Sequence, residues 1–151
     1  MKVAILSGSV YGTAEEVARN AKQLLTDAGF EVLFNPRAKL AEIQAFAPDA
    51  FLAVTSTTGM GELPDNLTPL YNEIRDLLPA AWRGLPGAVI ALGDSSYGDT
   101  YCCGGQLLTE LFAELGLRVV QPMLRLDSSE TVTPEADSEP WVEEFIKALT
   151  Q

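Results

Sequence analysis

The sequence predicts an α/β fold in which a mostly parallel sheet is covered by helices on both faces. Short apolar runs alternate with amphipathic segments along all 151 residues, in the order βαβαβαβαβα. The run at residues 50–55 is apolar nearly throughout, which is typical of a strand covered on both faces. Since no internal repeat, low-complexity tract or linker interrupts the pattern, we expect one domain over residues 1–151.

The first half of the chain contains three of the five predicted strands. Residues 3–6 form the first strand, and the helix that follows runs to about residue 27, where Gly29 provides a C-terminal stop. The other predicted elements are a strand at 30–34, a helical or irregular crossover at 38–46, and the strand at 50–55.

The second half contains two strands and three helices. Asp65 or Asn66 is expected to cap a helix whose apolar face runs from Leu67 to Leu78. The remaining predicted elements are a strand at 85–92, a helix at 107–115 that Gly116 ends, a strand at 118–126, and a last helix that starts at Thr133-Pro134 and buries Trp141 to Leu149.

The first loop, residues 7–15, has the composition of an anion site. It is rich in Gly, Ser and Thr and leads directly into a helix, whose first N–H groups lack intrahelical partners and carry partial positive charge. It has neither a P-loop nor a G-x-G-x-x-G motif, and it contains no lysine. The pattern therefore favours a monophosphate held by neutral donors, with a plain βα turn as the alternative.

The second loop (residues 56–64) and the third loop (residues 93–105) follow the third and fourth strands. In a sheet of order 2-1-3-4-5, all three loops meet at the carboxyl ends of the strands, where such sheets bind ligands. Tyr97 suits stacking on a flat conjugated ligand, unless it only covers the following helix. The glycines of the second loop expose backbone groups that suit the edge of a heterocycle, unless the loop binds nothing.

The composition argues against several classes of site. The chain has no histidine, which removes the commonest general base and metal ligand, so a hydrolase triad or a zinc site is not expected. Cys102 and Cys103 are adjacent and lack the C-x-x-C spacing of redox and metal motifs.

The charge balance is strongly acidic, with 21 acidic and 10 basic residues and a formal net charge of −11. Nucleic acid and anionic membrane surfaces would be repelled, whereas a basic protein partner is favoured; the alternative is that the acidity serves solubility alone. No apolar run reaches membrane-spanning length and no signal peptide is visible, so we expect a cytoplasmic protein.

A family resemblance rests on three segments: Ser9-Val10-Tyr11-Gly12-Thr13, Ser56-Thr57-Thr58-Gly59, and Leu92-Gly93-Asp94-Ser95-Ser96-Tyr97 with Cys102. Together they resemble the three FMN-binding loops of flavodoxins, over essentially the whole chain. The chain is of short-chain flavodoxin length, and the segments at 55–59, 66–70 and 140–143 are most similar to YqcA-type bacterial flavodoxins. The resemblance implies a flavodoxin-like doubly wound five-stranded parallel sheet of order 2-1-3-4-5, with FMN as cofactor.

The resemblance also implies a role for each loop. The first loop would bind the FMN phosphate, and the second would line the ribityl chain and ring edge, with Gly59 near flavin N5. In the third loop, Asp94 would meet the pyrimidine edge, Tyr97 would stack on one ring face, and the Cys102 backbone would reach a ring carbonyl. The candidate cofactor-binding residues are Ser7, Ser9, Val10, Tyr11, Gly12, Thr13, Ala14, Ser56, Thr57, Thr58, Gly59, Met60, Gly61, Gly93, Asp94, Ser95, Tyr97, Tyr101 and Cys102.

Two positions depart from the family pattern. Ala14 stands where flavodoxins often have Thr, and one lost hydrogen bond to an anion costs about 1.5–3 kcal/mol, so somewhat weaker FMN binding is expected. Thr58 stands where many flavodoxins have Trp, which leaves one ring face bare or covered by Met60.

The implied function is one-electron transfer. The protein would shuttle electrons as a monomer between a basic-faced flavoprotein reductase of the ferredoxin/flavodoxin-NADP reductase type and acceptor enzymes. Four carboxylates near the ring would disfavour the fully reduced anionic flavin and steer basic partners: Glu62, Asp65, Asp94 and Asp99. The alternatives are an FMN-dependent oxidoreductase acting directly on quinones or similar molecules, and a response-regulator-like binding module.

Overall fold

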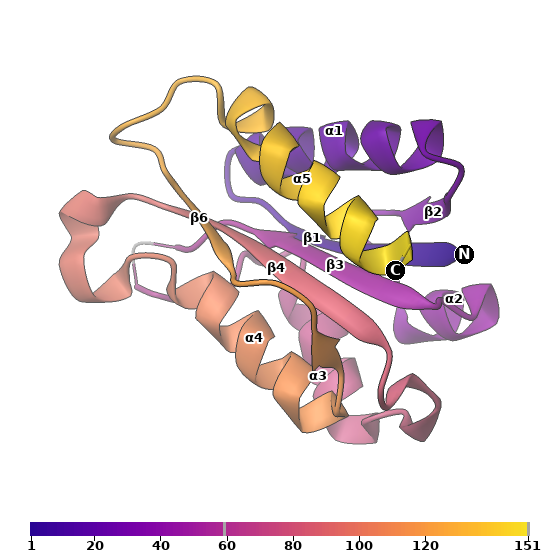
Figure 1. The fold of residues 1–151 in the computed structure, drawn as a ribbon. Helices are drawn as coiled ribbons and strands as arrows, with labels where there is room; N and C mark the ends of the chain where they lie inside the picture. The colour runs from indigo at the N-terminus through magenta and orange to yellow at the C-terminus, as the bar shows by residue number, and fades with distance from the viewer. Residues whose placement is uncertain (59, 151) are drawn as a thin grey trace.

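A parallel sheet runs through the middle of the protein (Figure 1). The computed structural model describes residues 1–58 and 60–150, apart from the side chains of Tyr97, Asp99 and Thr100. The central strand β3 (Ala50–Thr55) is buried throughout and pairs with β1 (Lys2–Gly8) on one side and β4 (Pro86–Gly93) on the other. With β2 (Glu31–Phe34) beside β1, the order is β2-β1-β3-β4-β5, as predicted.

The predicted fifth strand at 118–126 is wrong as one element, because it is divided. β5 (Arg118–Val119) pairs with the start of β4, and β6 (Leu124–Asp127) pairs with its end. Pro122 lies between the two pieces; it has no N–H for the ladder and restricts the residue before it. The segment between β5 and β6 is held by Trp141, whose indole N–H donates to the Pro122 carbonyl at 3.0 Å.

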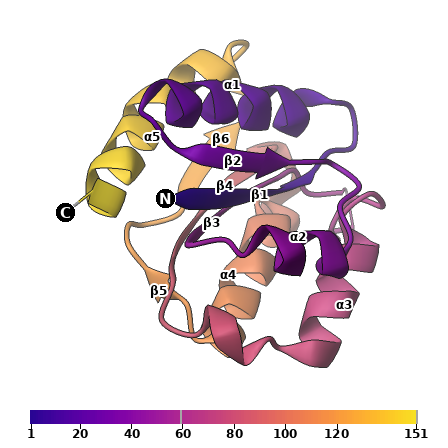
Figure 2. The same cartoon turned by 90° about the vertical axis from the view of Figure 1, so that its right-hand side faces the viewer.

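Helices cover both faces of the sheet, as predicted (Figure 2). Along β1, Val3 and Ile5 face one core while Ala4 and Leu6 face the other, which is the two-residue alternation of a strand. The first core packs against α1 (Thr13–Asp27) and α5 (Pro134–Thr150). The second packs against α2 (Leu40–Phe46), α3 (Thr68–Leu77), η1 (Ala80–Trp82) and α4 (Cys103–Leu115).

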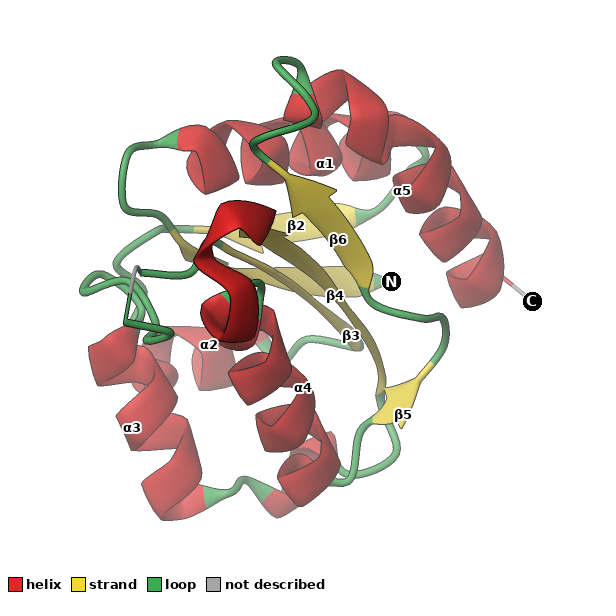
Figure 3. Ribbon diagram, turned by 90° about the vertical axis from the view of Figure 1, so that its left-hand side faces the viewer, coloured by secondary structure: helices red, strands yellow, loops and turns green. Residues whose placement is uncertain are grey.

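The carboxyl ends of the strands form one edge of the molecule, which faces the viewer in Figure 3. The loops after β1, β3 and β4 all emerge there, because the three strands are parallel and adjacent. The third loop is more ordered than predicted, since it contains the short helix η2 (Ser95–Thr100) and since α4 already begins at Cys103. In the part of the chain that is described, no helix is both long and apolar enough to span a membrane.

Candidate functional site

The first loop presents backbone N–H groups at the start of α1. Gly12 has a left-handed backbone with φ of 90°, and the helix has no side-chain cap. The first intrahelical bond runs from Glu16 N to Gly12 O at 3.0 Å, so the N–H groups of residues 13–15 precede it. The Ser9 hydroxyl accepts a bond from Gly12 N at 2.6 Å, which holds the loop in a compact turn. This arrangement fits a bound phosphate.

The other predicted residues of the first loop differ in exposure. Tyr11 is 94% exposed and Val10 is partly exposed, whereas Ala14 is fully buried in the core beneath α1. Ala14 therefore offers the site its N–H group only. Ser7 is buried and its hydroxyl has no hydrogen-bond partner among the described residues. A buried hydroxyl without a partner is uncommon in a folded protein and is consistent with a site that receives a polar ligand.

The hydroxyl groups of the second loop tie neighbouring segments together. Ser56 Oγ accepts a bond from Val10 N at 3.2 Å, and Thr57 Oγ1 accepts one from Gly104 N at 2.9 Å. Thr58 Oγ1 accepts a bond from Glu62 N at 3.0 Å and closes its own loop. Because a threonine hydroxyl that accepts a bond can still donate its proton, these contacts orient donors as well as loops.

The tip of the second loop is open to solvent. Gly61 has φ of 81° and donates its N–H to the Thr58 carbonyl at 2.9 Å. Met60 is 80% exposed, so its side chain is available to cover a bound group. Gly59 lies outside the described residues, as does the Tyr97 side chain, so the roles expected for both remain predictions.

The third loop begins with a self-contained turn. Asp94 Oδ1 accepts bonds from Ser96 N at 2.9 Å and Ser96 Oγ at 2.6 Å, which caps η2. Gly93 allows the chain to fold back closely, since a Cβ there would lie 2.8 Å from Cys102 N. The close packing brings the end of β4 against the start of α4.

A carboxylate that the sequence analysis missed holds the third loop from the other side. Asp127 Oδ1, at the end of β6, accepts bonds from Ser95 N at 3.1 Å and from Ser129 Oγ at 2.7 Å. The two serine hydroxyls lie 3.1 Å apart. Hydrogen bonds from Ser95 and then Ser129 hold the pKa of the Asp127 carboxyl well below its usual range. Its position at the carboxyl end of the last strand was the signal that could have identified it.

Tyr101 and Cys102 lie in the third loop directly before α4. Burial, followed by the neighbouring Cys102, raises the pKa of Tyr101 to about 12. Burial also raises the pKa of the Cys102 thiol, which is almost fully buried and lies 3.8 Å from the Ala91 carbonyl. Cys102 has a left-handed backbone at the start of α4, which turns the chain into the helix.

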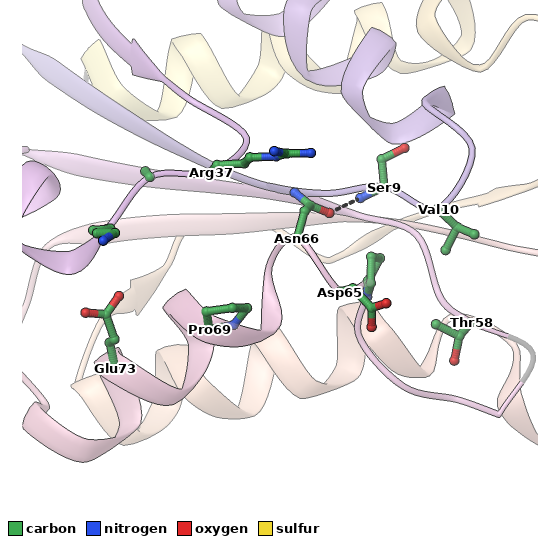
Figure 4. A pocket seen from close by; sticks show the side chains of 11 residues that line it. Ser9, Val10, Arg37, Thr58, Asp65, Asn66, Pro69 and Glu73 are labelled. Atoms are coloured by element: carbon green, nitrogen blue, oxygen red, sulfur yellow. Dashed lines mark hydrogen bonds between the residues drawn. The ribbon is translucent and has the colours of Figure 1, made fainter.

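Asn66 joins three segments and does not cap α3. The helix begins at Thr68 without a side-chain cap, so the predicted capping role for Asp65 or Asn66 is wrong. Instead, Asn66 Oδ1 accepts a bond from Ser9 N at 2.9 Å (Figure 4). Its Nδ2 donates to the carbonyls of Ser7 at 2.8 Å and Pro36 at 2.7 Å. The amide thus links the first loop to the β2–α2 turn.

Comparison with known proteins assigns the family. The model of the flavodoxin family matches residues 5–141. The chain belongs to the flavodoxin family. It is similar to a cysteine-to-serine variant of a flavodoxin from Pseudomonas aeruginosa, with 71% identity, full coverage of both chains and a TM-score of 0.96. It is also 41% identical to flavodoxin YqcA of Pectobacterium carotovorum, over 94% of this chain and 93% of that protein.

A more distant solved structure shares the fold. The Fusobacterium nucleatum flavodoxin bound to flavin mononucleotide is 18% identical, has a TM-score of 0.76, and covers 97% of each chain. The predicted membership of a short-chain, YqcA-like flavodoxin group is therefore confirmed. As a flavodoxin, this protein is an electron carrier and works with redox partners.

Proposed function

We propose that this flavodoxin binds FMN across its three loops and passes single electrons from a reductase to acceptor enzymes. The observation that carries the proposal is the meeting of the uncapped N-terminus of α1 with the second and third loops at one edge of the sheet. Bound FMN supplies the one-electron chemistry, and the residues of the chain hold and tune it.

The three loops divide the work of binding. The N–H groups of Tyr11 and of residues 13–15, with the hydroxyls of Ser9 and Thr13, bind the phosphate, where the helix terminus favours negative charge. Residues 56–58 line the ribityl chain and ring edge, and the hydroxyls of Thr57 and Thr58, which accept bonds from backbone N–H groups, donate to them. The third loop provides the pyrimidine edge contact through Asp94, stacking through Tyr97, and a backbone contact from Cys102.

The charge of the chain suits basic partners. A net charge of −11 speeds encounters with a positively charged protein and repels nucleic acid and anionic membranes. We assign the electron donor to flavoprotein reductases of the ferredoxin/flavodoxin-NADP reductase type. We propose that the protein acts as a monomer, because all three binding loops belong to one chain, and that it is a single domain that works in the cytoplasm.

The decisive experiment is stepwise anaerobic reduction of the protein with FMN added, followed by visible absorption. An electron carrier shows two separated one-electron steps. Bound FMN that accepts two electrons in one step would instead support an oxidoreductase acting directly on quinones. Failure to bind FMN would refute the proposal.

A further inference from the structure

A groove of about 820 Å³ lies beside the first loop, on its α3 side. It is bounded by Ser9 and Val10 of the first loop, by Thr58 of the second, and by the turn between β2 and α2 (Figure 4). Arg37 and Lys39 from that turn also line it. Thr58 has a short side chain, so it leaves the groove open next to the first loop.

The turn that carries Arg37 is held in place by hydrogen bonds. Asn35 Oδ1 accepts a bond from Arg37 N at 3.0 Å, and Asn35 O accepts one from Ala38 N at 3.0 Å. The Pro36 carbonyl accepts a bond from the amide of Asn66, whose oxygen holds Ser9 N. One side chain therefore connects the residue before Arg37 to the first loop.

The Arg37 side chain extends across Asn66 toward Ser9 (Figure 4). It is exposed, and among the side chains that the structure describes no carboxylate lies within ion-pair distance of its guanidinium. Asp65 and Glu73 also line the groove, but neither forms an ion pair with Arg37. Glu73 Oε1 instead accepts a bond from Leu40 N at 3.4 Å. The planar guanidinium of Arg37 has the geometry to hold a phosphate through two parallel hydrogen bonds.

We propose that Arg37 binds the phosphate group of FMN from this groove, on the side opposite the helix terminus. The proposal rests on the proposed binding of FMN to this flavodoxin. The guanidinium adds the positive charge that the first loop lacks, and it offsets the missing hydroxyl at Ala14. Asn66 is the positioning residue, because it keeps the turn carrying Arg37 next to Ser9.

The test compares FMN with riboflavin, which has the same ring and ribityl chain but no phosphate. The flavin-free protein is titrated with each flavin as wild type, Arg37→Gln, Arg37→Lys and Lys39→Gln. We expect Arg37→Gln to raise the Kd of FMN about tenfold, which corresponds to 1.4 kcal/mol, and to leave that of riboflavin within about twofold. Arg37→Lys recovers part of the loss, because it keeps the charge but not the planar fork.

Salt provides an independent readout. The Kd of FMN should rise less steeply with ionic strength in Arg37→Gln than in the wild type, because one charge pair is gone. An unchanged FMN affinity, or an equal loss for both flavins, would overturn the proposal. An equal loss of FMN affinity in Lys39→Gln would show that any positive charge near the groove has this effect, without a direct contact from Arg37, and would also overturn the proposal. If the wild type bound neither flavin, the proposed function itself would fail. If the wild type bound FMN and the Arg37 variants bound it equally well, only the proposal for Arg37 would fail.

Discussion

The side-chain oxygen of Asn66 accepts the backbone N–H of Ser9 at 2.9 Å, across 57 positions of sequence. The same amide donates to the carbonyls of Ser7 and Pro36, so all of its hydrogen bonds serve other segments. The shape of the first loop thus depends on a residue that lies just after the second loop.

Replacing Asn66 by Ala should lower the free energy of unfolding by about 1–3 kcal/mol, because three backbone groups lose their partner. Urea denaturation of the flavin-free protein measures this. Gln23→Ala is the control: it removes one exposed bond to Asp27 and should cost less than about 0.5 kcal/mol. Equal losses in the two variants would contradict the special role of Asn66.

The contact between Asp127 and the third loop should make stability depend on pH. The folded pKa of Asp127 lies below its unfolded value of 3.8, so its contribution is complete above that value and is lost as the pH falls toward the folded pKa. The stability difference between the wild type and Asp127→Asn should therefore be largest at neutral pH and shrink in acid. Denaturant titrations at several pH values measure it, and a difference independent of pH would argue against the prediction.

Tyr101 should ionise later than an ordinary tyrosine, at about 12 instead of 10.0. Because the folded pKa is raised, the phenol contributes stability below pH 10 that is lost as the pH rises through 12. An ultraviolet titration should show one late phase, and Tyr101→Phe should remove it. If the late phase persists in that variant, the assignment to Tyr101 is wrong.

Glu62 on the second loop and Asp65 directly after it are exposed, and there they would disfavour extra negative charge on the flavin. Glu62→Gln with Asp65→Asn should raise the potential of the second reduction step by tens of millivolts, the scale of a unit charge acting over roughly 10 Å near a protein surface. Spectroelectrochemical titration measures the potential. No change would reject an electrostatic role for these two carboxylates.

Met60 is expected to cover the flavin face that Thr58 leaves bare. Met60→Ala should then alter the visible spectrum of bound FMN and weaken its affinity about two- to tenfold, the range of a sulfur–aromatic contact. Val132→Ala, at another exposed apolar residue outside the three loops, serves as the control. An unchanged spectrum and affinity in Met60→Ala would exclude the contact.

Local patterns predicted most of the fold because strands and helices depend on residues close in sequence. The apolar run at 50–55 is the buried strand β3, and the loops after β1, β3 and β4 meet as expected. The prediction of one continuous strand at 118–126 was wrong because Pro122 interrupts the strand although the pattern around it is apolar. The capping role expected near residue 66 failed because a tertiary contact took the side chain that local rules assign to a helix end.

The sequence by itself determined the fold class and the three loop segments at the ends of the strands, because hydrophobic periodicity and turn composition are local properties. The strand order was implied by the family resemblance and not by these local patterns. Only the tertiary structure decided which groups hold those segments together. Asn66 meets Ser9, and Asp127 meets Ser95, across 57 and 32 positions of sequence. The physical reason is that such hydrogen bonds form only once parallel strands have brought their carboxyl ends to one edge.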